Sequence, residues 1–139
     1  MCGIAGIWDK YSFKNEELLN SVKKMAESVN YRGPDSQGYW IDENQRLALS
    51  HARLSILDLS SAGHQPMTSI NERYTIVFNG EIYNHKSLRK IIDNSSQDYF
   101  WRGESDTETL LAMIEIYGIR KTLNDIVGMF AIAIWDKAN

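Results

Sequence analysis

The sequence predicts a single mixed α/β domain, and three observations support that fold class. Amphipathic segments with helical period alternate with short segments rich in β-branched and aromatic residues along the 139-residue chain. One late segment, residues 129–135, is apolar on both faces, as expected for a strand that helices cover on both sides. The 43% hydrophobic and 24% charged fractions supply one core and indicate no second domain.

The first half of the chain predicts a strand, a helix and a series of short strands. A short buried strand is expected at residues 3–8, almost at the N-terminus. A helix follows from Asn15, with acidic residues in its first turn, and Gly33 and Pro34 end it. Its apolar stripe consists of Leu18, Leu19, Val22, Met25, Ala26 and Val29. Further strands are predicted at residues 38–41, 46–51 and 74–78.

The second half predicts three helices and the apolar strand at residues 129–135. The first helix spans residues 85–92, and a polar loop follows at residues 93–103. Ser105-Asp106-Thr107-Glu108 has the capping-box pattern, which predicts that a helix begins there, and Gly118 ends it. A shorter helix is expected at residues 119–126. A hairpin turn is expected where the sequence stops, so we expect the domain to be cut short at its C-terminal end.

Composition argues against several classes of partner and location. Lys plus Arg total 15 against 18 Asp plus Glu, so we expect no nucleic-acid partner. The longest apolar run is far shorter than the roughly 20 residues that span a bilayer, so we expect no membrane segment. The first residues lack a basic region typical of a secretory signal, which favours a cytoplasmic protein. His51, His64 and His85 have no metal-ligand spacing and there is a single cysteine, so no metal site is predicted.

Cys2 is the first candidate for chemistry. A lone cysteine is more often a packing residue than a nucleophile, but the position of this one changes that comparison. If Met1 is removed, the thiol and a free α-amine belong to the same residue. Because an α-amine titrates near operating pH and a thiol just above it, the amine can serve as the base that activates the thiol. Cys2 would then be an N-terminal nucleophile that needs no separate triad.

Three other positions each allow two interpretations. Asn79-Gly80 after the strand at 74–78 is typical of a hairpin turn, but these residues also supply the donors of an oxyanion hole. Arg53 sits inside an otherwise apolar strand-like segment with residues 54–57, where its charge is either solvated or grips a carboxylate in two places. Asp106 at a helix start is either a helix-dipole residue or a ligand-binding carboxylate. The local patterns leave all three open.

Seven short motifs occur in order along the whole chain, and together they are far more specific than any one of them. They are Met-Cys-Gly-Ile-Ala-Gly at 1–6, Tyr-Arg-Gly-Pro-Asp at 31–35, His-Ala-Arg-Leu-Ser-Ile at 51–56, Gly-His-Gln-Pro-Met at 63–67, Phe-Asn-Gly-Glu-Ile-Tyr-Asn-His at 78–85, Ser-Asp-Thr-Glu at 105–108 and Gly-Met-Phe-Ala at 128–131. The chain resembles the class II glutamine amidotransferase domain of asparagine synthetases.

The resemblance implies a four-layer αββα fold of the N-terminal-nucleophile hydrolase type and a set of site residues. Cys2 matches the nucleophile that attacks the side-chain amide of L-glutamine, forms a thioester and releases ammonia. The Asn79 side chain and the Gly80 backbone amide match the oxyanion donors. Arg53 matches the residue that binds the substrate carboxylate, and Asp106 the partner of its ammonium group. The remaining pocket residues implied by the match are Leu54, Ser55, Ile56, Leu57 and Glu81.

The resemblance also implies a partner domain and its cofactors. Family members carry a C-terminal synthetase domain that uses ATP and magnesium to convert aspartate to asparagine, and we expect that domain to be absent from residues 1–139. No cofactor is expected for the glutaminase domain itself, and a homodimer is left open. Two alternatives remain: the same glutaminase feeding another acceptor, as in polysaccharide- or peptide-modifying relatives, and a non-catalytic interaction module.

Overall fold

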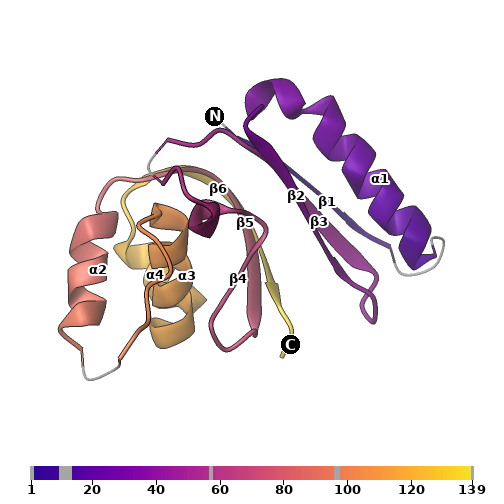
Figure 1. The fold of residues 1–139 in the computed structure, drawn as a ribbon. Helices are drawn as coiled ribbons and strands as arrows, with labels where there is room; N and C mark the ends of the chain where they lie inside the picture. The colour runs from indigo at the N-terminus through magenta and orange to yellow at the C-terminus, as the bar shows by residue number, and fades with distance from the viewer. Residues whose placement is uncertain (1, 10–13, 57, 96–97, 139) are drawn as a thin grey trace.

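A computed structural model describes residues 2–9, 14–56, 58–95 and 98–138, and it places two antiparallel three-stranded sheets between two helical layers (Figure 1). The first sheet has the order β1-β3-β2, with β1 at Gly3–Trp8, β2 at Ser36–Asp42 and β3 at Leu47–Arg53. The second has the order β4-β5-β6, with β4 at Met67–Thr68, β5 at Tyr74–Ile82 and β6 at Gly128–Asp136. β1 and β3 contact β5 across the interface. The arrangement is compatible with an αββα sandwich.

Helix α1, at Asn15–Ser28, covers the outer face of the first sheet (Figure 1). Leu18, Val22 and Ala26 are buried against that sheet, because positions four apart lie on one side of a helix. Met25 is 37% exposed, so its assignment to the buried stripe is wrong, since it lies beside the row that faces the strands. A 3₁₀ turn at Asn30–Arg32 follows α1, and the helical region ends before Gly33 and Pro34 as predicted.

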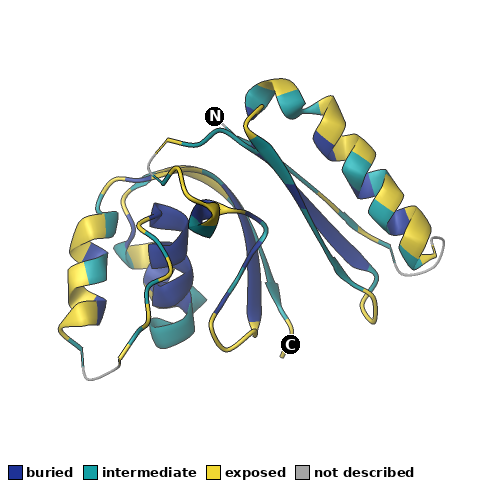
Figure 2. Ribbon diagram, viewed as in Figure 1, coloured by how far each residue is buried: buried dark blue, intermediate teal, exposed yellow. Residues whose placement is uncertain are grey.

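Helices α2 at His85–Asp93, α3 at Asp106–Tyr117 and α4 at Ile119–Asp125 pack on the outer side of the second sheet (Figure 1). Their predicted positions are confirmed to within one or two residues. Figure 2 shows that α3 is buried over most of its length, because it lies between the sheet and the other helices. The core here is made of Met67, Tyr74, Ile76, Phe78, Ile82, Leu88, Ile92, Leu110, Leu111, Ala112, Met113, Ile114 and Ile126.

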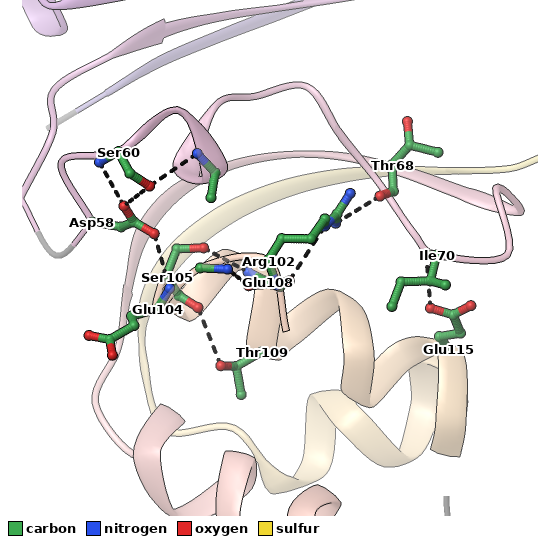
Figure 3. Close-up of polar contacts among 12 residues, drawn as sticks. Asp58, Ser60, Thr68, Ile70, Arg102, Glu104, Ser105, Glu108, Thr109 and Glu115 are labelled. Atoms are coloured by element: carbon green, nitrogen blue, oxygen red, sulfur yellow. Dashed lines mark hydrogen bonds and ion pairs between the residues drawn. The ribbon is translucent and has the colours of Figure 1, made fainter. Parts of the chain in front are cut away.

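The start of α3 is held by a variant of the predicted capping box (Figure 3). The Ser105 hydroxyl oxygen accepts a hydrogen bond from the Glu108 N–H at 3.1 Å, as predicted. The fully buried Glu108 carboxylate does not return to the cap residue; it accepts hydrogen bonds from the N–H groups of Arg102 at 2.7 Å and Gly103 at 2.9 Å. The loop that precedes α3 is therefore tied to the first turn of the helix.

Two strand predictions need correction. β5 continues to Ile82, so Asn79-Gly80 lies inside a strand and the hairpin interpretation is wrong. Pairing with β6 explains the continuation, because Asn79 lies opposite Ala131 and Gly80 opposite Phe130. The prediction that residues 129–135 are covered on both faces is also wrong, since Met129 is 65% exposed. β6 is the edge strand of its sheet, and the described elements cover it only in part.

The segment after Arg53 is not a strand. β3 ends at Arg53, and Leu54, Ser55 and Ile56 form a loop, because neither neighbouring strand extends far enough to pair with them. Leu57 lies outside the described residues. Among the helices that the structure describes, none has the length and apolar character needed to cross a membrane.

Candidate active site

A cavity of about 160 Å³ brings together the start of β1, the end of β3 with its loop, the middle of β5 and the first turn of α3. Nine of the ten residues predicted for the site line this cavity, and the tenth, Leu57, is outside the described residues. The nine are Cys2, Arg53, Leu54, Ser55, Ile56, Asn79, Gly80, Glu81 and Asp106. Segments separated by more than 100 residues in the sequence thus meet at one place.

Cys2 lies immediately before β1, and contacts from two motif segments hold it. Its carbonyl oxygen accepts a hydrogen bond from Arg32 Nε at 3.0 Å. Its Sγ accepts a hydrogen bond from the Leu54 N–H at 3.3 Å, since β3 ends beside the N-terminus of β1. A backbone N–H directed at sulfur stabilises negative charge on it. The half-buried free thiol therefore faces the cavity with one donor already in place.

Arg53 is oriented by the loop that follows it. Nη1 donates to the Ser60 carbonyl oxygen at 2.9 Å, and Nη2 donates to the Asp58 carbonyl oxygen. A guanidinium has five N–H donors, so three remain for a ligand after these two contacts. A Cβ atom at position 63 would collide with Nη2, so Gly63 allows the guanidinium to keep this position. The guanidinium of Arg53 is thus held at the cavity wall, and three of its N–H donors remain for a ligand.

Asp58 ties this loop to the start of α3 (Figure 3). Oδ1 accepts hydrogen bonds from the Ser60 N–H at 2.8 Å and hydroxyl at 2.6 Å, and Oδ2 accepts one from the Glu104 N–H at 3.0 Å. Burial opposes ionisation, but these hydrogen bonds and the charge of Arg53 together hold the pKa of Asp58 below its ordinary value. An ionised carboxylate therefore joins the wall that carries Arg53 to the wall that carries Asp106.

Asp106 is the first residue of α3 and is only 6% exposed. Its Oδ2 accepts a hydrogen bond from the Ile82 N–H at 2.9 Å. Burial raises the pKa of Asp106, although the Ile82 hydrogen bond and nearby His85 act in the opposite direction. A cationic group beside this carboxylate would offset the cost of burying its charge.

One edge of β5 presents backbone donors to the cavity. The N–H groups of Phe78 and Ile82 are bonded by side chains, to Gln65 Oε1 at 2.7 Å and to Asp106 Oδ2. Because strand groups alternate with a period of two, the Gly80 N–H points to the same edge, between those two. No described residue accepts a hydrogen bond from the Gly80 N–H at this edge. The strand thus offers a donor that a ligand can use.

The Asn79 carboxamide lines the cavity, and its Oδ1 is buried without a hydrogen-bond partner among the described residues. At the next position, a Cβ atom would collide with the Met129 carbonyl oxygen of β6. Only glycine therefore allows β6 to approach the strand at Gly80. An unanchored carboxamide and a free backbone N–H, adjacent on a strand beside the cavity, are the donor types of an oxyanion hole.

His51 lines the cavity and connects the two sheets there. It is 1% exposed, and its Nε2 donates a hydrogen bond to the Phe78 carbonyl oxygen at 3.1 Å. Burial lowers the pKa of His51 to about 4, and nearby His64 and Arg53 act in the same direction. The ring is therefore neutral at physiological pH, with the proton on the nitrogen that bonds Phe78.

Comparison with known families agrees with this arrangement. A family model described as a glutamine amidotransferase domain matches residues 1–139. The chain belongs to this family. It is 39% identical over 138 residues to asparagine synthetase [glutamine-hydrolyzing] 2 of Bacillus subtilis, which covers 99% of this chain and 17% of that protein. The resemblance inferred from the seven motifs is confirmed.

Other relatives carry related names. Asparagine synthetase B [glutamine-hydrolyzing] of Escherichia coli is 36% identical over 138 residues, covering 98% of this chain and 23% of that protein. Amidase chry2 of Gibberella zeae is 30% identical over 145 residues, covering 99% of this chain and 21% of that protein. This glutamine amidotransferase domain thus spans about a fifth of the length of the curated relatives that it matches.

Sequence reasoning missed several residues that line the cavity of this amidotransferase domain, among them Asp58, Gln65 and Thr107. Gln65 and Thr107 belong to motifs that indicated the family, but nothing in the motifs showed their contacts. Asp58 had no local signal, because its partner Glu104 is 46 positions away. Within the described ranges, no group of three or more His, Cys, Asp or Glu residues could hold a metal ion.

Proposed function

We propose that this chain hydrolyses the side-chain amide of L-glutamine to give glutamate and ammonia. The observation that carries the proposal is the cavity that holds the Cys2 thiol, the Asn79 and Gly80 donors, and the opposite charges of Arg53 and Asp106. Family membership supports it, as do relatives whose names describe them as glutamine-hydrolysing. The proposal places the fold among the N-terminal-nucleophile hydrolases.

The reaction begins once Met1 has been removed. The α-amine of Cys2 takes the thiol proton, and Sγ attacks the amide carbon of glutamine, forming an S–C bond. The Asn79 carboxamide and the Gly80 N–H stabilise the negative oxygen of the tetrahedral intermediate. The C–N bond then breaks, and ammonia leaves with the proton held by the α-ammonium. Water attacks the resulting thioester, which releases glutamate and restores the thiol.

Both ends of the amino acid are recognised at the cavity wall. The three remaining N–H donors of Arg53 bind the α-carboxylate, and Asp106 binds the α-ammonium. With those ends held, only a side chain as long as that of glutamine brings its amide to Cys2, so the shorter asparagine is rejected. Leu54, Ser55, Ile56 and Glu81 complete the wall. Leu57 is proposed with them from the motif alone.

Intact-mass spectrometry tests the nucleophile directly. The purified chain is measured before and after treatment with diazo-oxo-norleucine, an electrophilic glutamine analogue, with Cys2→Ala as the matched control. We expect loss of Met1 and one covalent adduct that glutamine blocks and that Cys2→Ala lacks. A folded, processed chain that forms no adduct contradicts the proposal.

For the destination of the ammonia, we propose aspartate, amidated to asparagine in an ATP-dependent step. Relatives named asparagine synthetases support this acceptor. ATP and magnesium would bind in a synthetase region, as the resemblance to asparagine synthetases implies. The relative named an amidase favours a different acceptor as the second candidate. The test supplies the protein, in its natural sequence context, with glutamine, ATP, magnesium and aspartate. We expect asparagine as a product. Formation of glutamate without asparagine favours the second candidate.

A further inference from the structure

We propose that Gln65 is a positioning residue that sets the geometry of the Asn79 and Gly80 donors and links them to the first turn of α3. The inference rests on the proposed glutamine hydrolysis for its effect on rate, and on the contacts of Gln65 for its structural part. Gln65 has no place in the reaction described above, yet it is 5% exposed and both ends of its side-chain amide are bonded.

The side chain of Gln65 replaces a missing stretch of strand. β4 pairs with β5 only at Met67 opposite Ile76 and Thr68 opposite Thr75. Continued in the same antiparallel register, the chain would bring position 65 opposite Phe78. At this position the side chain of Gln65, in place of its backbone, bonds the strand. Its Oε1 accepts the hydrogen bond from the Phe78 N–H at 2.7 Å. The edge of β5 is thus held just before Asn79 while the cavity beside Gly80 stays open.

Phe78 is held at both of its backbone groups. Its N–H is bonded by Gln65, and its carbonyl oxygen is bonded by His51 Nε2. The neighbouring Asn79 Oδ1 has no partner among the described residues, so contacts through that atom do not fix the carboxamide. The direction of both oxyanion donors therefore depends on the backbone conformation that begins at Phe78. Loss of the Gln65 bond frees the edge on which the Gly80 N–H lies.

The other end of Gln65 reaches the helix that carries Asp106. Nε2 donates a hydrogen bond to the Thr107 Oγ1 at 3.2 Å, and Thr107 is buried in the first turn of α3. The strand with the oxyanion donors and the helix with the ammonium-binding carboxylate are thus joined by one side chain. Asp106 keeps its own hydrogen bond from the Ile82 N–H when Gln65 is changed, whereas the strand beside the donors loses its bond, so loss of Gln65 should lower kcat and leave KM nearly unchanged.

The test combines glutamine-hydrolysis kinetics with amide hydrogen exchange, using the protein in its natural sequence context. Gln65→Met keeps the length of the side chain and removes both hydrogen bonds. We expect kcat to fall about 10- to 100-fold, less than for outright loss of an oxyanion donor, with KM within about threefold. We also expect the Phe78 amide, which Gln65 bonds, to exchange about tenfold faster, while amides bonded to β6, such as Val77, keep their rates. The exposed Gln45→Met is the matched control and should change neither readout.

Thr107→Val and Thr107→Ser separate positioning from a general loss of folding. Thr107→Val removes the acceptor of Gln65 Nε2 and should give a smaller fall in kcat than Gln65→Met. Thr107→Ser keeps a hydroxyl and should restore most of the rate.

An unchanged kcat in Gln65→Met, or a change confined to KM, overturns the inference. If the wild-type protein hydrolyses no glutamine, the proposed function fails, and exchange alone decides: an unchanged Phe78 amide in Gln65→Met then overturns the positioning role too. If Gln65→Met does not fold, equal kcat values in the two Thr107 variants overturn it.

Discussion

The two walls of the cavity are built differently. On one wall, Asn79 and Gly80 lie within β5, where Phe78 is buried and bonded by two side chains. On the other wall, Arg53 precedes a loop in which Ile56 and Leu59 are exposed, and carbonyl groups and the Asp58 carboxylate hold it in place. The oxyanion donors proposed to act on the reacting amide therefore lie on a strand, and the group that recognises the carboxylate lies beside a loop. Changes to the strand wall should affect kcat, and changes to the loop wall should affect KM.

The largest effect is expected for Cys2→Ala, which removes the bond-forming atom. Glutamine hydrolysis should fall to the background rate, because neither wall can replace the nucleophile. Glutamine binding measured by calorimetry should change only a few-fold, since Arg53 and Asp106 are untouched. A Cys2→Ala protein that still hydrolyses glutamine would place the chemistry elsewhere.

Asn79→Ala tests the strand wall itself. Removing one oxyanion donor costs about 2.7–4 kcal/mol of barrier, so kcat should fall about 10²- to 10³-fold while KM changes little. Steady-state kinetics measure both parameters, and the exposed turn residue Asn44, changed to Ala, serves as the matched control. If KM rises as steeply as kcat falls, Asn79 binds the ground state as strongly as the transition state, and the proposed division between the walls fails.

His51 gives the strand wall a pH dependence of its own. With a pKa of about 4 in the folded protein and 6.5 when unfolded, the unfolded chain binds the extra proton between these values. Its contribution to stability is thus complete above pH 6.5 and is lost as pH falls through 4, at most about 3 kcal/mol. The free energy of unfolding, measured with denaturant for wild type and His51→Gln across this pH range, isolates the contribution of His51. Parallel pH profiles would show that His51 does not contribute in this way.

The same contrast explains what could be predicted from sequence. Helix positions followed from apolar periodicity and from signals such as Ser105 and Gly118, which act within one or two turns. The extension of β5 through Asn79-Gly80 did not, because pairing with β6, about 50 residues later, overrides the local turn preference. The site residues that lie in recognisable motifs were predicted, and nine of them line one cavity. Asp58 and Gln65 were missed because their bonds to the Glu104 and Phe78 N–H groups link segments that only the fold brings together, and a backbone N–H carries no side-chain identity in a sequence.

The smallest effect is expected on the loop wall, from Asp58→Asn. The change retains side-chain size but weakens the hydrogen bonds to Ser60 and Glu104, and it removes the negative charge near Arg53. Charge-assisted bonds of this kind are worth roughly 1.5–3 kcal/mol, and a neutral amide keeps part of that. We expect KM for glutamine to rise about five- to tenfold and kcat to stay within about twofold, because Arg53 and Asp106 lose their fixed separation while the oxyanion donors do not move. Asp98→Asn, on an exposed loop, is the matched control. A fall in kcat at constant KM would show that this carboxylate supports the reacting groups after all, so the two walls would not act separately.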